Sequence, residues 1–318
     1  MAIKKSELYS KLWKSCDELR GGMDASQYKD YILVLLFVKY VSDKYSGKKG
    51  LIEIPKGGSF QDMVELIGKP EIGEEINKIV GKLAEANGLK GIIDNANFDD
   101  DDKLGKGKAM QDRLSNLVGI FDDDDLDFSK SRAEGDDLLG DAYEYLMRNF
   151  ATQSGKSKGQ FYTPSEVSTT IAKIIGTSGA TRRDQTVYDP TCGSGSLLLK
   201  VAHEASSGVT IYGQEIDVAT RAMCVMNMWL HENQYATIAR ENTITHPQFT
   251  NKQALKEFDF AVANPPFSTK SWSRGLNPEN DEFKRFDGFD IPPSKNGDYA
   301  FLLHLVKSIK RTGKGAII

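Results

Sequence analysis

Phe258-Asp-Phe-Ala-Val-Ala-Asn-Pro-Pro-Phe267 joins a short apolar strand directly to a stiff turn. The two prolines fix φ at successive positions and remove two backbone donors, so the carbonyl groups after Asn264 are free to accept hydrogen bonds. The Asn264 side-chain oxygen and the Pro265 carbonyl can together accept both hydrogens of an exocyclic amine. Phe267 offers a flat face for stacking a base turned out of a duplex. An ordinary strand-ending turn is the alternative for the tetrapeptide alone.

The chemistry of such an amine predicts a second binding site. The amine of a purine or pyrimidine is a poor nucleophile because its lone pair is delocalised into the ring. Two acceptors that draw on its N–H bonds localise this lone pair and direct it at an electrophile. The methyl sulfonium of S-adenosylmethionine is the natural electrophile, so we expect a cofactor site close to Asn264.

Length and composition describe an ordinary globular chain of about two domains, with 318 residues, 39% of them hydrophobic and 27% charged. The longest apolar run, near Ile32 to Val38, is far shorter than a membrane span, and the N-terminus lacks the apolar core of a signal peptide. We therefore expect a cytoplasmic protein. The three cysteines are too few and too scattered for a disulfide framework or a zinc site, and no metal is expected.

The charge balance bears on nucleic-acid binding. The net charge of -4 argues against a protein that grips nucleic acid unaided over a large surface, because non-specific affinity depends on Lys and Arg neutralising phosphates. If the substrate is DNA, a partner is expected to supply much of the affinity for it.

Residues 1–150 show helical periodicity and are predicted to form an α-helical N-terminal domain. Asp24-Ala-Ser-Gln27 has the spacing of a capping box, ahead of a helix that is apolar nearly all round and is expected in the core. No titratable cluster here has the spacing of a catalytic site, so a structural or docking role is predicted. The runs Asp99–Asp102 and Asp122–Asp125 lack the pattern of a calcium loop and are interpreted as solvated loops.

A bridge rich in glycine, serine and lysine, Ser154–Gly159, is interpreted as a linker to a second domain, 151–318. It leads into the turn Gln160-Phe-Tyr-Thr-Pro-Ser165. In this turn Thr163 is expected to be the N-cap of a helix, Pro164 its first residue and Glu166 its third, which is the spacing of a capping box.

This helix start is a candidate contact for the methionine end of the cofactor, because a well-capped N-terminus can hold a carboxylate. A merely well-formed helix start is the alternative. The helix is expected to bury Val167, Ile171, Ile174 and Ile175 and to end at Gly176.

Beyond the turn, strand and helix patterns alternate, which predicts an α/β domain with a mainly parallel sheet covered on both faces. Strands are expected at 186–188, 209–213, 237–240 and 258–263. Ligands of such sheets bind at the carboxyl ends of the strands. Each expected strand is followed by a candidate polar or glycine group: Gly193 and Gly195, Glu215, Asn242, and Asn264. This coincidence is stronger evidence than any single motif.

Each of these groups has a chemical interpretation. The glycine turn Asp189-Pro-Thr-Cys-Gly-Ser-Gly195 lets a ligand approach the backbone, and it lacks both the third glycine of a dinucleotide fingerprint and the lysine of a phosphate loop. Glu215, with Asp217 as second choice, is placed to bind ribose hydroxyls, and a solvated loop acid is the alternative. Asn242 is placed to hydrogen-bond an adenine edge. Cys192 is interpreted as a packing residue rather than a reactive thiol.

In chain order these motifs resemble the N6-adenine DNA methyltransferases whose cofactor motifs precede the catalytic one. The N-terminal half is similar to the modification (methylation) subunit of type I restriction-modification systems. The resemblance covers nearly the whole chain and rests on these stretches: Leu12-Trp13, Asp24–Tyr40, Gln160–Pro164, Asp189–Gly195, Gln214-Glu215 and Asn264–Phe267.

The resemblance implies a Rossmann-like S-adenosylmethionine-dependent methyltransferase sheet preceded by an α-helical N-terminal domain. It implies S-adenosyl-L-methionine as the cofactor and N6 of adenine in DNA as the methyl acceptor. A specificity subunit, a second methylation subunit and an endonuclease subunit are the implied partners, and no membrane is involved.

Carried over position by position, the resemblance implies catalytic roles for Asn264, Pro265, Pro266 and Phe267. Glu241-Asn242-Thr243 departs from the Gly-Asp-Thr that the family often has, although Asn can still pair with an adenine edge. The implied cofactor contacts are Gln160, Phe161, Tyr162, Thr163, Pro164, Ser165, Asp189, Gly193, Ser194, Gly195, Glu215 and Asn242.

Residues 268–298 are polar, and they are interpreted either as a mobile lid or DNA-contacting loop or as a disordered insertion. A helix from Tyr299 to Ile309 and a strand from Gly313 to Ile318 are expected to follow. The family's sheet has two further strands, so we expect a C-terminally truncated sheet and a fragment that is inactive in isolation. Two alternatives stay open: a methyltransferase that acts on RNA or on a protein glutamine, and a cofactor-binding subunit without activity.

Overall fold

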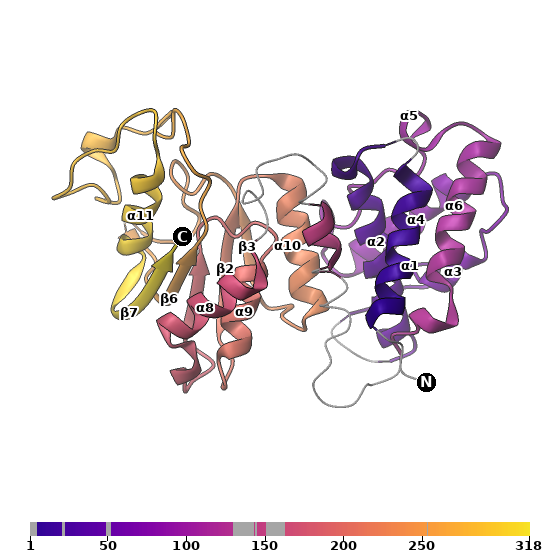
Figure 1. Ribbon diagram of the computed structural model, residues 1–318, viewed down its shortest axis with the longest axis horizontal. Coiled ribbons are helices and arrows are strands. Elements are labelled where there is room, and N and C mark those ends of the chain that lie inside the picture. The colour runs from indigo at the N-terminus through magenta and orange to yellow at the C-terminus, as the bar shows by residue number, and fades with distance from the viewer. Residues whose placement is uncertain are drawn as a thin grey trace. The chain divides into compact units, whose positions relative to one another are not determined.

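The computed structural model describes residues 5–20, 23–48, 52–129, 143, 145–150, 163–252 and 254–318. The chain forms two compact units, Met1–Gly155 and Lys156–Ile318, which can be followed by colour from indigo to yellow in Figure 1. The predicted linker and the predicted contacts Gln160, Phe161 and Tyr162 lie outside the described residues. The predicted domain boundary after residue 150 stays a prediction.

The described part of the first unit is helical. Residues 31–42 are all buried, as the continuous apolar sequence predicted, and the Asp24 backbone N–H donates to Gln27 Oε1 (3.2 Å), which is half of the predicted capping box. The interpretation of Asp99–Asp102 as a loop was wrong, because Asp100 accepts from the backbone of Asp102 and Lys103 and so caps a short helix. The helices are α1 (Lys5–Arg20), α2 (Ala25–Tyr45), α3 (Phe60–Val64), α4 (Ile72–Ala86), α5 (Asp101–Leu104), α6 (Lys108–Phe121) and the 3-10 turn η1 (Asp124–Leu126).

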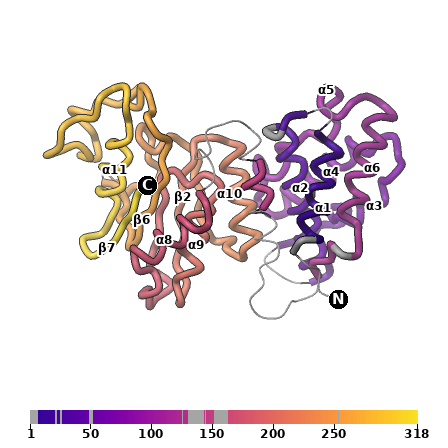
Figure 2. Tube along the Cα trace, viewed as in Figure 1, coloured from indigo at the N-terminus to yellow at the C-terminus, as the bar shows by residue number. Residues whose placement is uncertain are grey.

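The second unit is built on a five-stranded sheet in the order β3-β2-β1-β6-β7, in which every neighbouring pair is parallel. The predicted α/β fold is therefore confirmed. Figure 2 shows the same arrangement along the Cα trace, with the yellow strand β7 on one side of the sheet and β2 towards the other. The strands are β1 (Thr186–Asp189), β2 (Thr210–Glu215), β3 (Thr237–Arg240), β6 (Phe258–Ala263) and β7 (Ile309–Ile317); β4 (Thr250–Asn251) and β5 (Ala254–Leu255) form a separate antiparallel pair.

The strand order positions the site. The chain runs from β1 outward to β3, then returns to the other side of β1 to form β6 and β7. The direction of winding therefore reverses at β1, and this reversal is the place where open parallel sheets bind ligands. Because β1 pairs with both β2 and β6, the segments after Asp189, Glu215 and Ala263 leave the sheet at the same edge.

Helices cover both faces of the sheet, as expected from the alternation of strands and helices. Side chains of α8, α9 and α10 pack with Val187, Ile211 and Phe260 in one buried cluster. On the opposite face Tyr188 stacks on Phe258 with ring centroids 4.4 Å apart. The helices of this unit are α8 (Ser165–Ile175), α9 (Ser196–Glu204), α10 (Val218–Leu230) and α11 (Asp298–Lys307), with 3-10 turns η2 (Thr177–Gly179) and η3 (Pro278–Asn280).

The start of α8 differs from the prediction. Pro164 occupies the N-cap position without a side-chain hydrogen bond to the helix, so the capping box built on Thr163 and Glu166 was wrong. The Thr163 hydroxyl instead accepts a hydrogen bond from Asn264, the residue directly after β6. Val167 and Ile174 were also predicted to be buried, but they are 39% and 71% exposed. The helix ends as predicted, with Gly176 in the left-handed conformation at φ 70°.

The segment after Phe267 is packed rather than an open polar insertion. Trp272 and Phe286 are buried against α11 and against Ile244 in a cluster of their own. Arg285 is 2% exposed, so its side chain is not available for DNA contact, while the interpretation of the segment as a lid or DNA-contacting loop stays a prediction. The predicted helix from Tyr299 is present as α11, and the strand predicted from Gly313 begins earlier, at Ile309.

Candidate active site

The glycine turn and the acidic strand end meet directly. The Gly193 backbone N–H donates to Glu215 Oε2 (3.1 Å), and Glu215 Oε1 accepts from the Asp217 backbone N–H (2.8 Å). Burial raises the pKa of Glu215, and these two backbone donors oppose the shift. Glu215 therefore lies against the glycine turn, while Asp217 caps α10 through a bond from the Thr220 N–H.

The glycine turn lies tightly against α10. Gly195 has φ 80°, and a Cβ on it would lie 2.5 Å from Met228 Cε. Asn227 Nδ2 donates to the Ser194 carbonyl (2.9 Å), which fixes the middle of the turn. Cys192 is buried with its Sγ 3.8 Å from that of Cys224, and this contact and burial both raise its pKa, in agreement with a packing thiol.

Asp189 is a buried carboxyl at the end of β1, only 2% exposed. Its pKa is raised to about 7, chiefly by burial and also by the nearby charge of Glu215, while the Thr191 N–H, which donates to Oδ1 (2.8 Å), opposes the shift. Two acids that repel one another at one sheet edge favour a cationic ligand, because a positive charge stabilises both ionised forms.

Asn264 is the third group at this edge. Its Nδ2 donates to Thr163 Oγ1 (3.3 Å), while its Oδ1 is buried and has no hydrogen-bond partner among the described residues. Thr163 is held in turn by Ser196, the first residue of α9, whose Oγ accepts from the Thr163 N–H and donates to the Thr163 carbonyl, both at 3.3 Å. The Thr163 turn, the glycine-turn helix and the end of β6 are therefore one hydrogen-bonded assembly.

The side chains beside Asn264 suit an extruded ring. Phe267 is 64% exposed, although large aromatic side chains are usually buried. Pro265 is buried, and the Pro266 carbonyl accepts from Thr269 Oγ1 (3.0 Å), so the turn itself is anchored.

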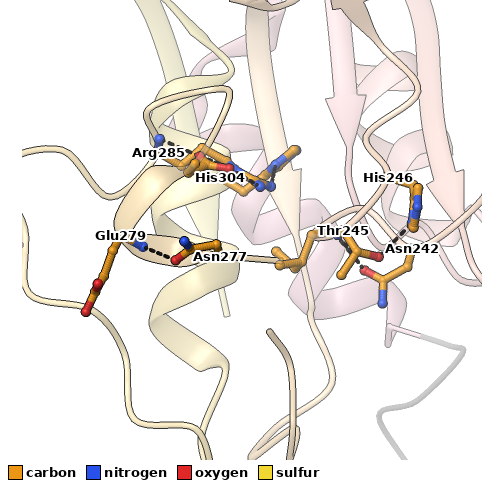
Figure 3. A network of polar contacts seen from close by, with 9 residues as sticks. Asn242, Thr245, His246, Asn277, Glu279, Arg285 and His304 are labelled. Atoms are coloured by element: carbon orange, nitrogen blue, oxygen red, sulfur yellow. Dashed lines mark hydrogen bonds and ion pairs between the residues drawn. The ribbon is translucent and has the colours of Figure 1, made fainter. Parts of the chain in front are cut away.

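Asn242 is only partly available for a ligand. Its Oδ1 accepts from the backbone N–H groups of Ile244 (2.8 Å) and Thr245 (3.2 Å), and Figure 3 shows it in this turn. The Nδ2 group is the part of the side chain that could donate to an adenine nitrogen. Its predicted contact with an adenine edge stays a prediction.

Two residues near the site were given no role of their own in the sequence analysis. Gln214 is fully buried, donates to the carbonyls of Glu241 (3.1 Å) and His246 (3.0 Å), and thereby holds the loop after β3 beside Glu215. Ile216 is 59% exposed directly after Glu215, so an apolar surface adjoins the acid. For Gln214, the signal available in the sequence was a glutamine at the end of a predicted buried strand. No periodicity could identify the second.

The residues present fit S-adenosylmethionine. The cofactor carries a sulfonium and an ammonium group, which match the buried acid Asp189, and ribose hydroxyls, which match Glu215. Gly193 has φ 55°, a conformation that favours a residue without a Cβ, and the Asn264 Oδ1, which has no partner among the described residues, lies at the same sheet edge as these acids. In the described part of the chain no cluster of His, Cys, Asp or Glu side chains could hold a metal ion.

Fold and site together define an S-adenosylmethionine-dependent methyltransferase. Residues 134–318 match the family model described as N-6 DNA Methylase, and residues 8–121 match the HsdM N-terminal domain. The chain belongs to the N-6 DNA methylase family, which confirms the resemblance predicted from its motifs.

Known relatives agree with this placement. The chain is 29% identical over 374 residues to the methylase subunit of the type I restriction enzyme MpnII of Mycoplasma pneumoniae, covering 99% of this chain and 68% of the relative. It is 25% identical to the methylase subunit of the MjaIX enzyme of Methanocaldococcus jannaschii, covering 98% of this chain and 60% of that one. The crystal structure of the type I restriction-modification methyltransferase subunit of Streptococcus thermophilus superposes with a TM-score of 0.81 at 26% identity, covering 99% and 74%.

Proposed function

We propose that the chain transfers the methyl group of S-adenosylmethionine to N6 of an adenine in DNA, as the modification subunit of a type I restriction-modification complex. The observation that carries this proposal is the Asn264 Oδ1 atom, which is buried and accepts no hydrogen bond from any described residue, at the sheet edge that also holds Asp189 and Glu215. A buried acceptor left unpaired is costly, and a donor from the substrate removes that cost.

The residues divide the work between two ligands. When bound, the cofactor supplies an electrophilic methyl group. Asn264 Oδ1 and the Pro265 carbonyl accept the two N6 hydrogens, and Phe267 stacks on the extruded adenine. Glu215 binds the ribose hydroxyls of the cofactor, and Asp189 faces its cationic end. The turns 163–165 and 193–195 enclose the remaining parts of the cofactor.

The partners follow from charge and from the family. The net charge of -4 leaves little capacity to neutralise phosphates, so a specificity subunit that reads and grips the DNA is part of the proposal. A second methylation subunit and an endonuclease subunit complete the proposed complex, which acts in the cytoplasm. No helix in the described part of the chain has the length and apolar character needed to cross a membrane.

The test measures methyl transfer and cofactor binding separately, on the protein assembled with its specificity subunit. Cofactor labelled in its methyl group is incubated with duplex DNA, RNA and protein, and the labelled product is identified. Asn264→Ala is expected to reduce transfer to DNA by about 100-fold or more while the Kd for the cofactor changes by less than about 3-fold, because the lost group acts on the amine alone. Asn251→Ala, at an exposed asparagine of β4, is the matched control.

Two outcomes would contradict the proposal. Label in RNA or in a protein glutamine, and not in adenine, would assign the site to another acceptor. Loss of cofactor binding in Asn264→Ala would show that this residue serves the cofactor rather than the amine.

A further inference from the structure

A chain of buried hydrogen bonds crosses the second unit from the segment 268–297 to the loop after β3. Arg285 Nη1 contacts His304 Nδ1 (3.3 Å), His304 Nε2 contacts the Tyr188 hydroxyl (3.1 Å), and that hydroxyl contacts Thr243 Oγ1 (3.4 Å). All four residues are buried. Figure 3 shows the first contact of this hydrogen-bond series, between Arg285 and His304.

The direction of these bonds is determined by Arg285. A guanidinium group only donates, so His304 Nδ1 accepts and the ring proton is on Nε2. Nε2–H then donates to the Tyr188 oxygen, and the Tyr188 hydroxyl donates to Thr243. Burial and the charge of Arg285 lower the pKa of His304 to about 3, against the opposing effect of Asp281, so the ring is neutral and can accept in this way.

The buried ion pair between Arg285 and Asp281 is by itself weak evidence for a role in stability. Arg285 Nε and Nη2 donate to the two carboxylate oxygens of Asp281 (2.9 and 2.7 Å), and both side chains are 1% exposed. Desolvating such a pair commonly costs as much as the pairing returns, and well-packed apolar residues serve stability equally well. Directional bonds, however, hold one geometry, whereas apolar contacts tolerate small rotations.

The geometry that these bonds hold includes the neighbourhood of Phe267. His304 lies on α11, six residues or about 9 Å of helix from Asp298 at its start. Asp298 Oδ1 accepts from the backbone N–H of Ser268 (2.7 Å), and the Gly297 N–H donates to the Thr269 carbonyl (3.1 Å). Ser268 has φ 52°, which is unusual for a residue other than glycine and persists only where the surroundings enforce it. The residue directly before it is Phe267.

We propose that His304 is a positioning residue for the target base: through Arg285 and Tyr188 it fixes α11 on the sheet, and through Asp298 it fixes the Phe267 ring relative to Asn264. This inference rests on the proposed function, because it assigns Phe267 to the extruded adenine. His304 itself touches neither substrate nor cofactor.

The test compares His304→Leu with His304→Gln in the complete assembled protein. Leucine keeps the volume and removes both hydrogen bonds, whereas the glutamine amide retains one acceptor and one donor. We expect His304→Leu to lower kcat/KM for DNA by about 10- to 100-fold, since a displacement of about 1 Å has effects of this size. The Kd for S-adenosylmethionine is expected to change by less than 3-fold, and His304→Gln to recover at least part of the activity. His203→Leu, at an exposed histidine of α9, is the matched control.

A second readout does not depend on turnover. Trp272 is 4% exposed in the segment 268–297 and donates through Nε1 to the Pro293 carbonyl (2.9 Å). With Trp13 and Trp229 replaced by Phe, its fluorescence reports the packing of this segment alone. His304→Leu is expected to make Trp272 more accessible to a soluble quencher, and His203→Leu is not.

The outcomes separate the two claims. Unchanged quenching of Trp272 together with kcat/KM within 2-fold of the unaltered protein would overturn the positioning role. If His304→Leu fails to fold, Tyr188→Phe decides in the same two assays, because it removes one oxygen and leaves the ring stacked on Phe258. Absence of transfer to adenine by the unaltered protein would contradict the proposed function alone, since the Trp272 signal needs no catalysis.

Discussion

Replacing Thr163 by valine tests whether its hydroxyl serves Asn264 or the cofactor. The sequence assigned Thr163 to a helix cap and to the cofactor, but its Oγ1 accepts from Asn264 Nδ2 at 3.3 Å. Thr163→Val keeps the shape of the side chain and removes this acceptor. Thr163→Ser retains the hydroxyl and is the matched control.

The expected magnitude follows from the geometry. A neutral hydrogen bond contributes about 0.5–1.5 kcal/mol, and an unpaired buried donor costs about 1–3 kcal/mol. Thr163 is only 6% exposed, so water is not expected to replace the lost bond well. If about 1–2 kcal/mol of the orientation of Asn264 is lost at the transition state, kcat falls by about 5- to 30-fold.

The assay is kcat for methyl transfer at saturating DNA and cofactor, with the cofactor Kd measured by calorimetry. Thr163→Val is expected to lower kcat while the Kd changes by less than about 2-fold, and Thr163→Ser to keep both values. A weaker cofactor affinity with an unchanged kcat would refute this reasoning. It would show that the Thr163 hydroxyl contacts the cofactor rather than orienting Asn264.

Three further predictions concern the same site. Since the pKa of Asp189 is raised to about 7, chiefly by burial, the affinity for the cationic cofactor measured by titration is expected to rise about 10-fold from pH 6 to pH 8, and Asp189→Asn should flatten this dependence. The folded pKa lies above the unfolded one, so the contribution of Asp189 to the free energy of unfolding is full below about pH 4 and is lost as pH rises through 7. Gly195→Ala places a Cβ 2.5 Å from Met228 Cε and is expected to lower the free energy of unfolding by about 1–3 kcal/mol in thermal denaturation, more than Gly208→Ala, whose new Cβ has its nearest neighbour at 3.9 Å. Phe267 is 64% exposed, so Phe267→Leu should leave the melting temperature unchanged but raise KM for DNA by about 5- to 10-fold through lost stacking; an unchanged KM would count against the stacking role.

The sequence was sufficient for most strands and helices of the second unit and for the edge at which the site lies. Alternation of apolar strands with amphipathic helices is a local property, and it located the four predicted strands and the helices between them. The rule that parallel strands present ligand groups at their carboxyl ends then placed Gly193, Glu215 and Asn264 together. These groups lie at one edge because β1 pairs with both β2 and β6, a strand order that came from the tertiary structure.

Tertiary structure alone decided which partner each polar side chain takes. Thr163 has the local pattern of a helix cap, but its hydroxyl accepts from Asn264, 101 residues away in the chain. Asn242 uses its oxygen in its own turn, and Arg285 is buried against Asp281 and His304 although its surroundings in the sequence are polar. Local composition determines which backbone conformations are favourable. The hydrogen-bond partner of a side chain depends on which distant groups folding brings within about 3 Å, and no short window of sequence contains that information.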